Sequence, residues 1–211
     1  MINTTIVGYG EVTSPSIKTY IDRLEQYLAT YYPAISWRIY DISLKKCTLG
    51  DLKQHLKEKV LNYHPNIIFI RLSSQDIDIE RTDFVGKERL EIYLRDLLEE
   101  IVTHNNRTGL NNCVPIPVII TPPLIHEKPG KKGRTNNRLK QYIYELKSVT
   151  LAKGGIVIDL CEEISKKVNK EKYILEEGYG LTQEGENLLY DLVFIELTKL
   201  IDYQGVLKNR R

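Results

Sequence analysis

The segment Asn66-Ile67-Ile68-Phe69-Ile70-Arg71-Leu72-Ser73-Ser74-Gln75-Asp76 joins a nearly continuous apolar run to a polar turn. A short apolar run that is rich in isoleucine is typical of a strand buried on both faces of a parallel sheet. Four more runs of this kind occur along the chain, and they span residues 4–8, 36–42, 117–121 and 155–160. We therefore expect five strands in one parallel sheet.

Segments with helical periodicity separate and follow these runs. Apolar residues recur at spacings of three and four, which places them on one face of a helix. We expect Ser16 to cap the first helix and Thr182 to cap the last, and the fourth to end at Gly154-Gly155. The expected helices span about 17–31, 49–60, 90–101, 138–153 and 182–201.

The alternation of strands and helices predicts an α/β fold. The physical solution is a three-layer αβα sandwich of the flavodoxin-like kind, with a five-stranded parallel sheet and right-handed crossovers. Ligands of such folds bind outside the carboxyl ends of the strands. We therefore looked for chemistry in the residues that directly follow each apolar run.

Composition limits the classes of function. The 211 residues suit a single domain over 1–211, and a formal net charge of +2 does not favour nucleic acid or an anionic membrane as the partner. The chain opens without a charged, apolar leader and has no run long enough to span a bilayer, so we expect a cytoplasmic protein. Cys47, Cys113 and Cys161 are far apart and without metal-ligand spacing, which favours reduced structural thiols.

The strand ends and the last helix start carry five short blocks. They read Gly8-Tyr9-Gly10, Thr48-Leu49-Gly50-Asp51-Leu52, Ser73-Ser74-Gln75-Asp76, Ile120-Thr121-Pro122-Pro123 and Glu177-Gly178-Tyr179-Gly180-Leu181-Thr182-Gln183-Glu184-Gly185. In this order the blocks resemble those of the SGNH (GDSL-like) hydrolases, whose members include esterases, lipases and carbohydrate deacetylases. The resemblance covers nearly the whole chain and implies the SGNH hydrolase fold.

The same resemblance implies that the catalytic residues are replaced. The nucleophilic serine of the family falls on Gly10, and the catalytic histidine falls on Gly180. Of the two oxyanion-hole positions, the glycine falls near Lys46 and the asparagine falls on Gln75, while the aspartate of the last block falls on Glu177. Acyl transfer by this design needs a hydroxyl nucleophile and an imidazole base that act as a unit. We therefore expect a ligand-binding or scaffolding protein that needs no cofactor and no metal.

Three alternatives remain open on the residues alone. A displaced nucleophile after the first or third strand (Thr13, Ser14, Ser16, Ser73 or Ser74) with His126 as its base would give an active esterase. The carboxylates Glu11, Asp76 and Glu177 would meet at the pocket rim and bind a metal, although capping by Asp76 and solvation of the other two is the simpler expectation. The basic residues between 128 and 140 would capture an anion; they are Lys128, Lys131, Lys132, Arg134, Arg138 and Lys140.

If the strand ends meet as expected, one pocket collects most of these candidates. The residues predicted to line it are Tyr9, Gly10, Glu11, Ser74, Gln75, Asp76, His126, Arg134, Glu177 and Tyr179.

Overall fold

The computed structural model describes residues 2–12, 17–104, 114–130, 132–177 and 180–203. Five parallel strands form one sheet in the order β2-β1-β3-β4-β5. This is the predicted αβα sandwich, and the prediction of the fold is confirmed. The strands are β1 (Ile2–Glu11), β2 (Ile35–Leu44), β3 (Ile67–Arg71), β4 (Ile116–Ile120) and β5 (Ile156–Ile158).

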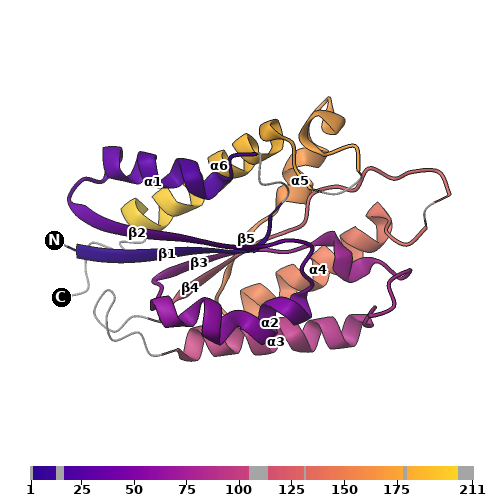
Figure 1. Ribbon diagram of the computed structural model, residues 1–211, viewed down its shortest axis with the longest axis horizontal. Coiled ribbons are helices and arrows are strands. Elements are labelled where there is room, and N and C mark those ends of the chain that lie inside the picture. Colours follow the sequence, from indigo (N-terminus) through magenta and orange to yellow (C-terminus); the bar gives the residue numbers. More distant parts are fainter. Residues whose placement is uncertain (1, 13–16, 105–113, 131, 178–179, 204–211) are drawn as a thin grey trace.

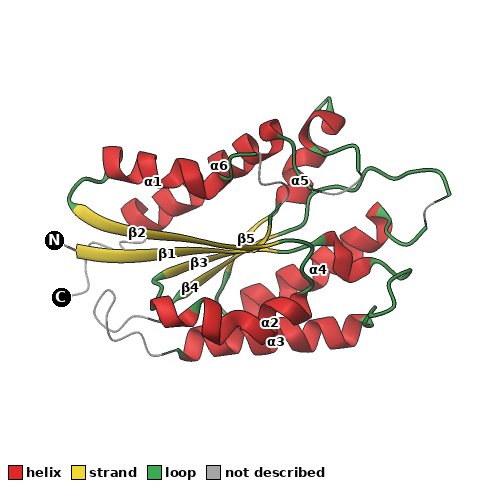
Figure 2. Cartoon of the chain, viewed as in Figure 1, coloured by secondary structure: helices red, strands yellow, loops and turns green. Residues whose placement is uncertain are grey.

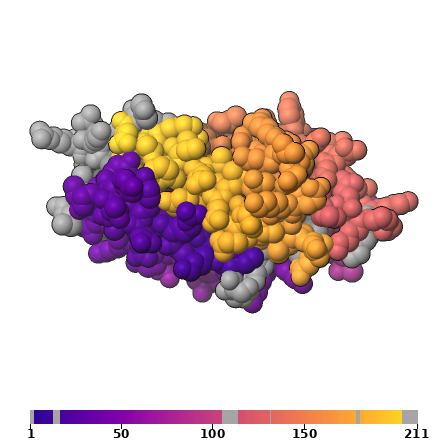
Figure 3. Space-filling view, turned by 90° about the horizontal axis from the view of Figure 1, so that it is seen from above, coloured from indigo at the N-terminus to yellow at the C-terminus, as the bar shows by residue number. Residues whose placement is uncertain are grey.

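Six α-helices cover the two faces of the sheet within the described residues (Figures 1 and 2). One face is covered by α1, α5 and α6, and the other by α2, α3 and α4. Figure 3 shows the first of these faces, on which α6 lies between α1 and α5. The helices are α1 (Tyr20–Tyr31), α2 (Leu49–Lys59), α3 (Lys87–Thr103), α4 (Asn136–Ala152), α5 (Leu160–Ser165) and α6 (Gln183–Thr198).

Short helical turns complete the connections. The 3₁₀ turn η2 (Ser74–Ile77) follows β3 directly and carries the polar residues that the sequence singles out. The remaining turns are η1 (Leu61–Tyr63), η4 (Lys170–Tyr173) and η5 (Lys199–Tyr203), the last a π-helical turn that extends α6.

The apolar core explains why the strands could be predicted from the sequence. Every residue of β3 is buried, because helices pack on both faces of this central strand. The apolar stripes of α2 and α3 are buried in the same core, at residues such as Leu52, Leu56, Leu94 and Leu98. None of the helices built from described residues is both long enough and apolar enough to span a bilayer.

Several element ends differ from the prediction, and three of the differences have a clear physical reason. β1 continues to Glu11 rather than ending at Gly8, because it pairs with β2 over its full length. α1 begins at Tyr20 and its cap is Thr19, whose amide donates to Asp22, so the prediction of Ser16 as the cap is wrong; Ser16 itself lies outside the described residues. The fifth strand is shorter than predicted because the Asp159 carboxylate accepts the Glu162 amide and starts α5, which the sequence analysis missed.

Candidate functional site

Gly10, to which the resemblance assigns the nucleophile position, lies near the carboxyl end of β1. It pairs with Ser43 of β2 and with Arg71 of β3, so it lies inside the sheet rather than on a free turn. Its φ of +114° lies in the region that favours glycine, and a Cβ atom built on it would lie 2.0 Å from the Arg71 carbonyl oxygen. The backbone therefore admits no side chain here, and a serine hydroxyl has no place.

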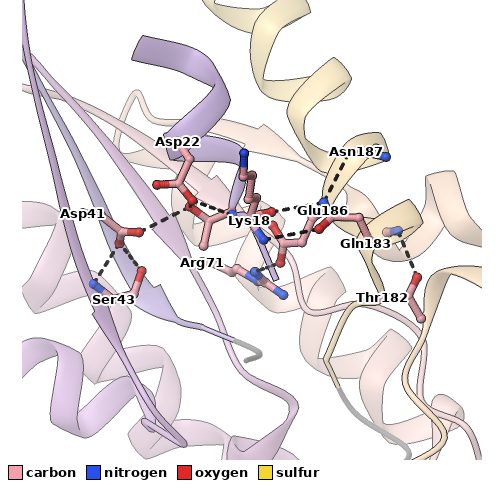
Figure 4. Close-up of polar contacts among 11 residues, drawn as sticks. Lys18, Asp22, Asp41, Ser43, Arg71, Thr182, Gln183, Glu186 and Asn187 are labelled. Atoms are coloured by element: carbon pink, nitrogen blue, oxygen red, sulfur yellow. Dashed lines mark hydrogen bonds and ion pairs between the residues drawn. The ribbon is translucent and has the colours of Figure 1, made fainter. Parts of the chain in front are cut away.

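A buried ion pair lies beside this strand end (Figure 4). Nη1 of Arg71, the last residue of β3, lies 2.5 Å from Oε1 of Glu186 in the first turns of α6. The side chains are only 3% and 2% exposed, and the second Glu186 oxygen, Oε2, has no hydrogen-bond donor among the described residues. Burial, followed by the nearby Asp41 carboxylate, raises the pKa of Tyr20 well above its usual range, so this phenol beside the pair stays neutral. The pair is thus a fully desolvated link between the centre of the sheet and α6.

Further polar contacts join the start of α1 to the same end of α6. The Lys18 amide donates to Oε1 of Gln183 at 3.3 Å, and the Gln183 amide group donates back to the Lys18 carbonyl. On the other side, Asp41 of β2 accepts from the Thr19 hydroxyl and from the Ser43 amide. Figure 4 shows these contacts on both sides of the Arg71–Glu186 pair. Structural hydrogen bonds therefore join the segment before α1 to β2 on one side and to the start of α6 on the other.

Gln75 stands at the position of the oxyanion-hole asparagine. Its backbone amide donates to the Ser73 hydroxyl, which caps η2. Its side-chain Nε2 donates to Oε1 of Glu11 at 3.2 Å, and its Oε1 accepts a hydrogen bond from Arg81. Arg81 is held in turn by Asp83 at 2.7 and 2.8 Å. The amide that the sequence retains is thus already bound to protein groups at both ends.

Asp76 lies next to Gln75 and is buried. Its Oδ1 accepts the Leu49 amide at the start of α2 (2.9 Å), and its Oδ2 accepts the hydroxyl of Tyr142 from α4 (3.1 Å). Burial, with a contribution from the Glu11 charge, raises the pKa of Asp76 to about 7. The simpler expectation was wrong in two respects: Asp76 holds the first amide of α2 rather than the segment after it, and Glu11 is buried rather than solvated.

The loop before α2 contains a residue in the left-handed conformation. Lys46 has a φ of +49°, in the region that glycine adopts most easily, and the resemblance places the family glycine near this residue. Thr48 then caps α2 by a reciprocal exchange of hydrogen bonds with Asp51. Cys47 between them is buried, and burial together with the Glu11 and Asp76 charges raises the pKa of its thiol to about 12. This thiol is therefore no substitute nucleophile.

The described residues of the last block do not line the cleft that Gln75 lines. Glu177 is exposed on a turn, and Gly180 is buried with a φ of +91°. Tyr179 lies outside the described residues, as do Thr13, Ser14 and Ser16. No group of three or more histidine, cysteine, aspartate or glutamate side chains converges within the parts of the chain that the structure describes.

His126 and the basic loop lie elsewhere. His126 is exposed and lines a cavity of about 390 Å³ with Lys140, Lys170 and Glu171, whereas Gln75 and Asp76 line a different cleft. Arg134 pairs with Asp78 at 3.3 Å, and Arg138 donates to the Lys132 and Gly133 carbonyl groups.

The prediction of one pocket is therefore only partly reproduced. Glu11, Gln75 and Asp76 are brought together, but His126, Arg134 and Glu177 do not line the cleft that Gln75 and Asp76 share. Lys131 lies outside the described residues. Lys128, Lys132 and Lys140 are exposed.

Comparison with known proteins supports the fold assignment. No protein-family model matches the chain, and no curated protein matches it in sequence. A lipase/acylhydrolase from Enterococcus faecalis superposes with a TM-score of 0.74, 20% sequence identity and coverage of 100% of both chains. An acetylxylan esterase from Geobacillus stearothermophilus superposes with a TM-score of 0.74 and 17% identity over 92% of this chain and 93% of the other. The chain thus has the SGNH/GDSL-type hydrolase fold.

Sequence reasoning missed the buried ion pair and the residues around Gln75. A signal existed for Arg71, because a single arginine inside the apolar run 67–72 is costly unless a buried acid compensates it. The sequence gave no such signal for Glu186, because a glutamate near the start of a helix is ordinarily solvated and is favoured there by the helix dipole. The sequence also gave no signal for Tyr142, which reaches Asp76 from α4, or for Arg81, which lies in the segment after η2 and turns back to Gln75.

Proposed function

We propose that this protein is a non-catalytic member of the SGNH hydrolase fold that binds a ligand and does not form an acyl-enzyme. The observation that carries the proposal is the backbone at Gly10, where the position of the nucleophile has no room for a side chain. Loss of the nucleophile costs nearly as much rate as loss of the whole catalytic set. Gly180 removes the base at its usual position as well.

The surroundings of Gln75 support the same conclusion. A donor stabilises an oxyanion only if its hydrogen points to the place where the charge develops. One N–H of Gln75 is directed to the Glu11 carboxylate, and the Arg81 guanidinium fixes the orientation of the whole amide. A negative charge that developed here would also lie close to the buried carboxylate of Glu11.

The experiment is a hydrolysis assay with the purified protein on a short-chain nitrophenyl ester. We expect a rate no higher than that of the same protein after heat denaturation. His126→Ala is the matched variant for the competing hypothesis of an active esterase with a displaced nucleophile. Turnover by the wild type that disappears in His126→Ala establishes that competing hypothesis. Turnover that survives in His126→Ala also overturns the non-catalytic proposal, because it shows that a group other than His126 acts as the base.

The third hypothesis, an anion binder that uses the basic loop, has less support from the geometry. Arg134 and Arg138 are the side chains best suited to grip an anion, and both are engaged by protein groups within the loop or next to it. A rise in thermal stability with phosphate that is lost in Arg138→Ala is the result that would favour it.

A further inference from the structure

The outer strand β2 presents an unprotected edge of the sheet. It has 10 residues, and among the described strands it pairs only with β1, in a register without a bulge (Figure 1). It contains neither proline nor lysine, two residues that commonly protect an exposed edge. The opposite edge strand, β5, has only 3 residues and is protected by its short length. The edge at β2 is therefore the place where the sheet can accept another strand.

Alternate residues of β2 direct their backbone groups away from β1. The Leu44 carbonyl group accepts the amide of the residue that follows β1, so the even-numbered residues of β2 face β1 and the odd-numbered residues face outward. Both ends of the outward row are already engaged. The Ile35 amide donates to the Tyr32 carbonyl group, and the Ser43 amide donates to the Asp41 side chain.

Three outward amides remain between these ends, those of Trp37, Ile39 and Asp41. They donate no hydrogen bond to another residue that the structure describes, and Ile39 lies at the centre of the three. A two-fold axis at Ile39 would place Trp37 opposite Asp41 of a second copy, and Ile39 opposite its own counterpart. Each free amide then meets an outward carbonyl group of the other strand. The edge is thus complementary to a second copy of itself when the two strands run antiparallel.

The side chains fit the same register. On the face of the sheet that carries α2, Arg38 would lie opposite Tyr40 of the second copy. The Tyr40 ring packs against the ring of Tyr63 in η1, with 4.2 Å between the centroids, and Tyr63 is 40% exposed. Arg38 is exposed, so its guanidinium group can lie over these rings. The positive charge of each copy therefore meets the electron-rich aromatic pair of the other.

Aromatic side chains also border the edge on the face that carries α1. Trp37 is half-buried and packs against Tyr32, with 6.3 Å between the ring centroids. Tyrosine and tryptophan are enriched where proteins associate. Both faces of the edge thus offer the kind of surface that a second copy can cover.

We propose that two copies of this chain form a dimer in which β2 pairs antiparallel with β2 around a two-fold axis at Ile39. The two sheets become one continuous sheet, and Arg38 of each copy contacts Tyr40 and Tyr63 of the other. Because the two-fold arrangement uses the same edge of both copies, association stops at the dimer. The proposal is independent of the proposed function, since neither Gly10 nor Gln75 takes part in the pairing.

The first test combines sedimentation velocity with amide hydrogen exchange on the full chain, over a wide range of micromolar concentrations. We expect the mass to rise from one chain to two. In the dimer, exchange in β2 peptides that contain Trp37, Ile39 and Asp41 should be roughly tenfold slower or more. A chain that stays monomeric overturns the proposal, as does a dimer without slower exchange in β2. Slow exchange of these amides in the monomer also overturns it, because another segment of the same chain then covers the edge.

Variants test the register. Arg38→Ala changes an exposed side chain, and we expect it to raise the dimer dissociation constant roughly fivefold to thirtyfold without changing thermal unfolding of the monomer. Arg95→Ala is the matched control, because Arg95 pairs with Glu91 on the surface of α3, and it should leave dimerisation unchanged. Equal association of wild type and Arg38→Ala overturns the proposed contact.

Oxidative cross-linking checks the same register by geometry. Positions 38 and 40 of the two copies form a pair without hydrogen bonds between their backbones, with Cα atoms about 4.5 Å apart, which a disulfide can bridge. The double variant Arg38→Cys with Tyr40→Cys should therefore give a dimer linked between positions 38 and 40. Arg38→Cys alone should give no such link, because position 38 faces Tyr40 of the other copy. Failure of the double variant to cross-link at concentrations where it is dimeric overturns the register.

Discussion

Removal of one partner of the Arg71–Glu186 pair should destabilise the protein strongly. Glu186→Gln keeps the shape of the side chain but removes the carboxylate that pairs directly with the buried Arg71 guanidinium. Breaking a buried pair in this way costs about 3–5 kcal/mol. A domain of this size has a free energy of unfolding of about 5–15 kcal/mol and shifts its Tm by roughly 2–4 °C for each kcal/mol. We therefore expect a fall in Tm of about 6–20 °C.

The double variant shows whether the loss is due to an unpaired charge. Arg71→Met together with Glu186→Leu replaces both ions by apolar side chains of similar reach. Such exchanges are often neutral, or stabilising by about 1–4 kcal/mol, because neither charge then has to be desolvated. The two single effects should therefore not add, and their difference from the double variant measures the coupling.

The assay is thermal and urea unfolding followed by circular dichroism at neutral pH. It compares wild type, Glu186→Gln, the two single variants Arg71→Met and Glu186→Leu, and the double variant. Glu196→Gln is the matched control, because Glu196 pairs with Lys199 on the surface, where the side chains are 25% and 52% exposed. A surface pair contributes about 0–1 kcal/mol, so this control should hardly change. A loss below about 1 kcal/mol in Glu186→Gln, or single effects that simply add, would refute the reasoning.

The remaining predictions concern the backbone, the buried acid, the helix cap and the thiol. Gly10→Ala should destabilise by clearly more than Gly154→Ala in thermal unfolding, because Gly154 has a φ of +74° and open space around it, whereas Gly10 combines a positive φ with a backbone clash at 2.0 Å. Between about pH 4 and 7 the folded chain holds a proton on Asp76 that the unfolded chain has released, so the free energy of unfolding should fall as pH rises, by at most about 1.4 kcal/mol per pH unit, and Asp76→Asn should remove this slope in urea titrations at several pH values. Thr48→Ala should cost about 1 kcal/mol in the same urea assay through loss of the α2 cap, and no loss would contradict the capping role. Iodoacetamide at pH 8 should leave Cys47 unmodified in peptide mass maps of the native protein, because burial raises its pKa to about 12, and rapid alkylation would show a more open loop.

The fold was predictable because the information for it is local. An isoleucine-rich run such as 67–70 has few alternatives to a buried parallel strand, and the glycine pair at 154–155 marks a helix end. Strand ends were less predictable. β1 continues past Gly8 because Gly10, which has no side chain, can pair closely with the neighbouring strands. The Glu11 carboxylate at its end accepts a hydrogen bond from the Gln75 side chain of η2.

The site was predictable only where a motif fixed the position. The blocks placed Gln75 and Asp76 side by side, matched Gly10 to the nucleophile position of the family, and put the family glycine near Lys46, whose φ is left-handed. What each side chain bonds to depends on tertiary contacts with no sequence signature. Leu49 of α2, Tyr142 of α4 and Arg81 of the segment after η2 together hold two adjacent residues.

Covalent labelling tests the absence of an acyl-enzyme most directly. The purified chain is incubated with a fluorophosphonate, which forms a stable adduct only with an activated hydroxyl nucleophile, and its intact mass is then measured beside that of an active SGNH esterase as the positive control. The account predicts that the mass of this protein stays unchanged while the esterase is fully labelled. A stoichiometric adduct that peptide mapping places on any serine or threonine of the chain would contradict it.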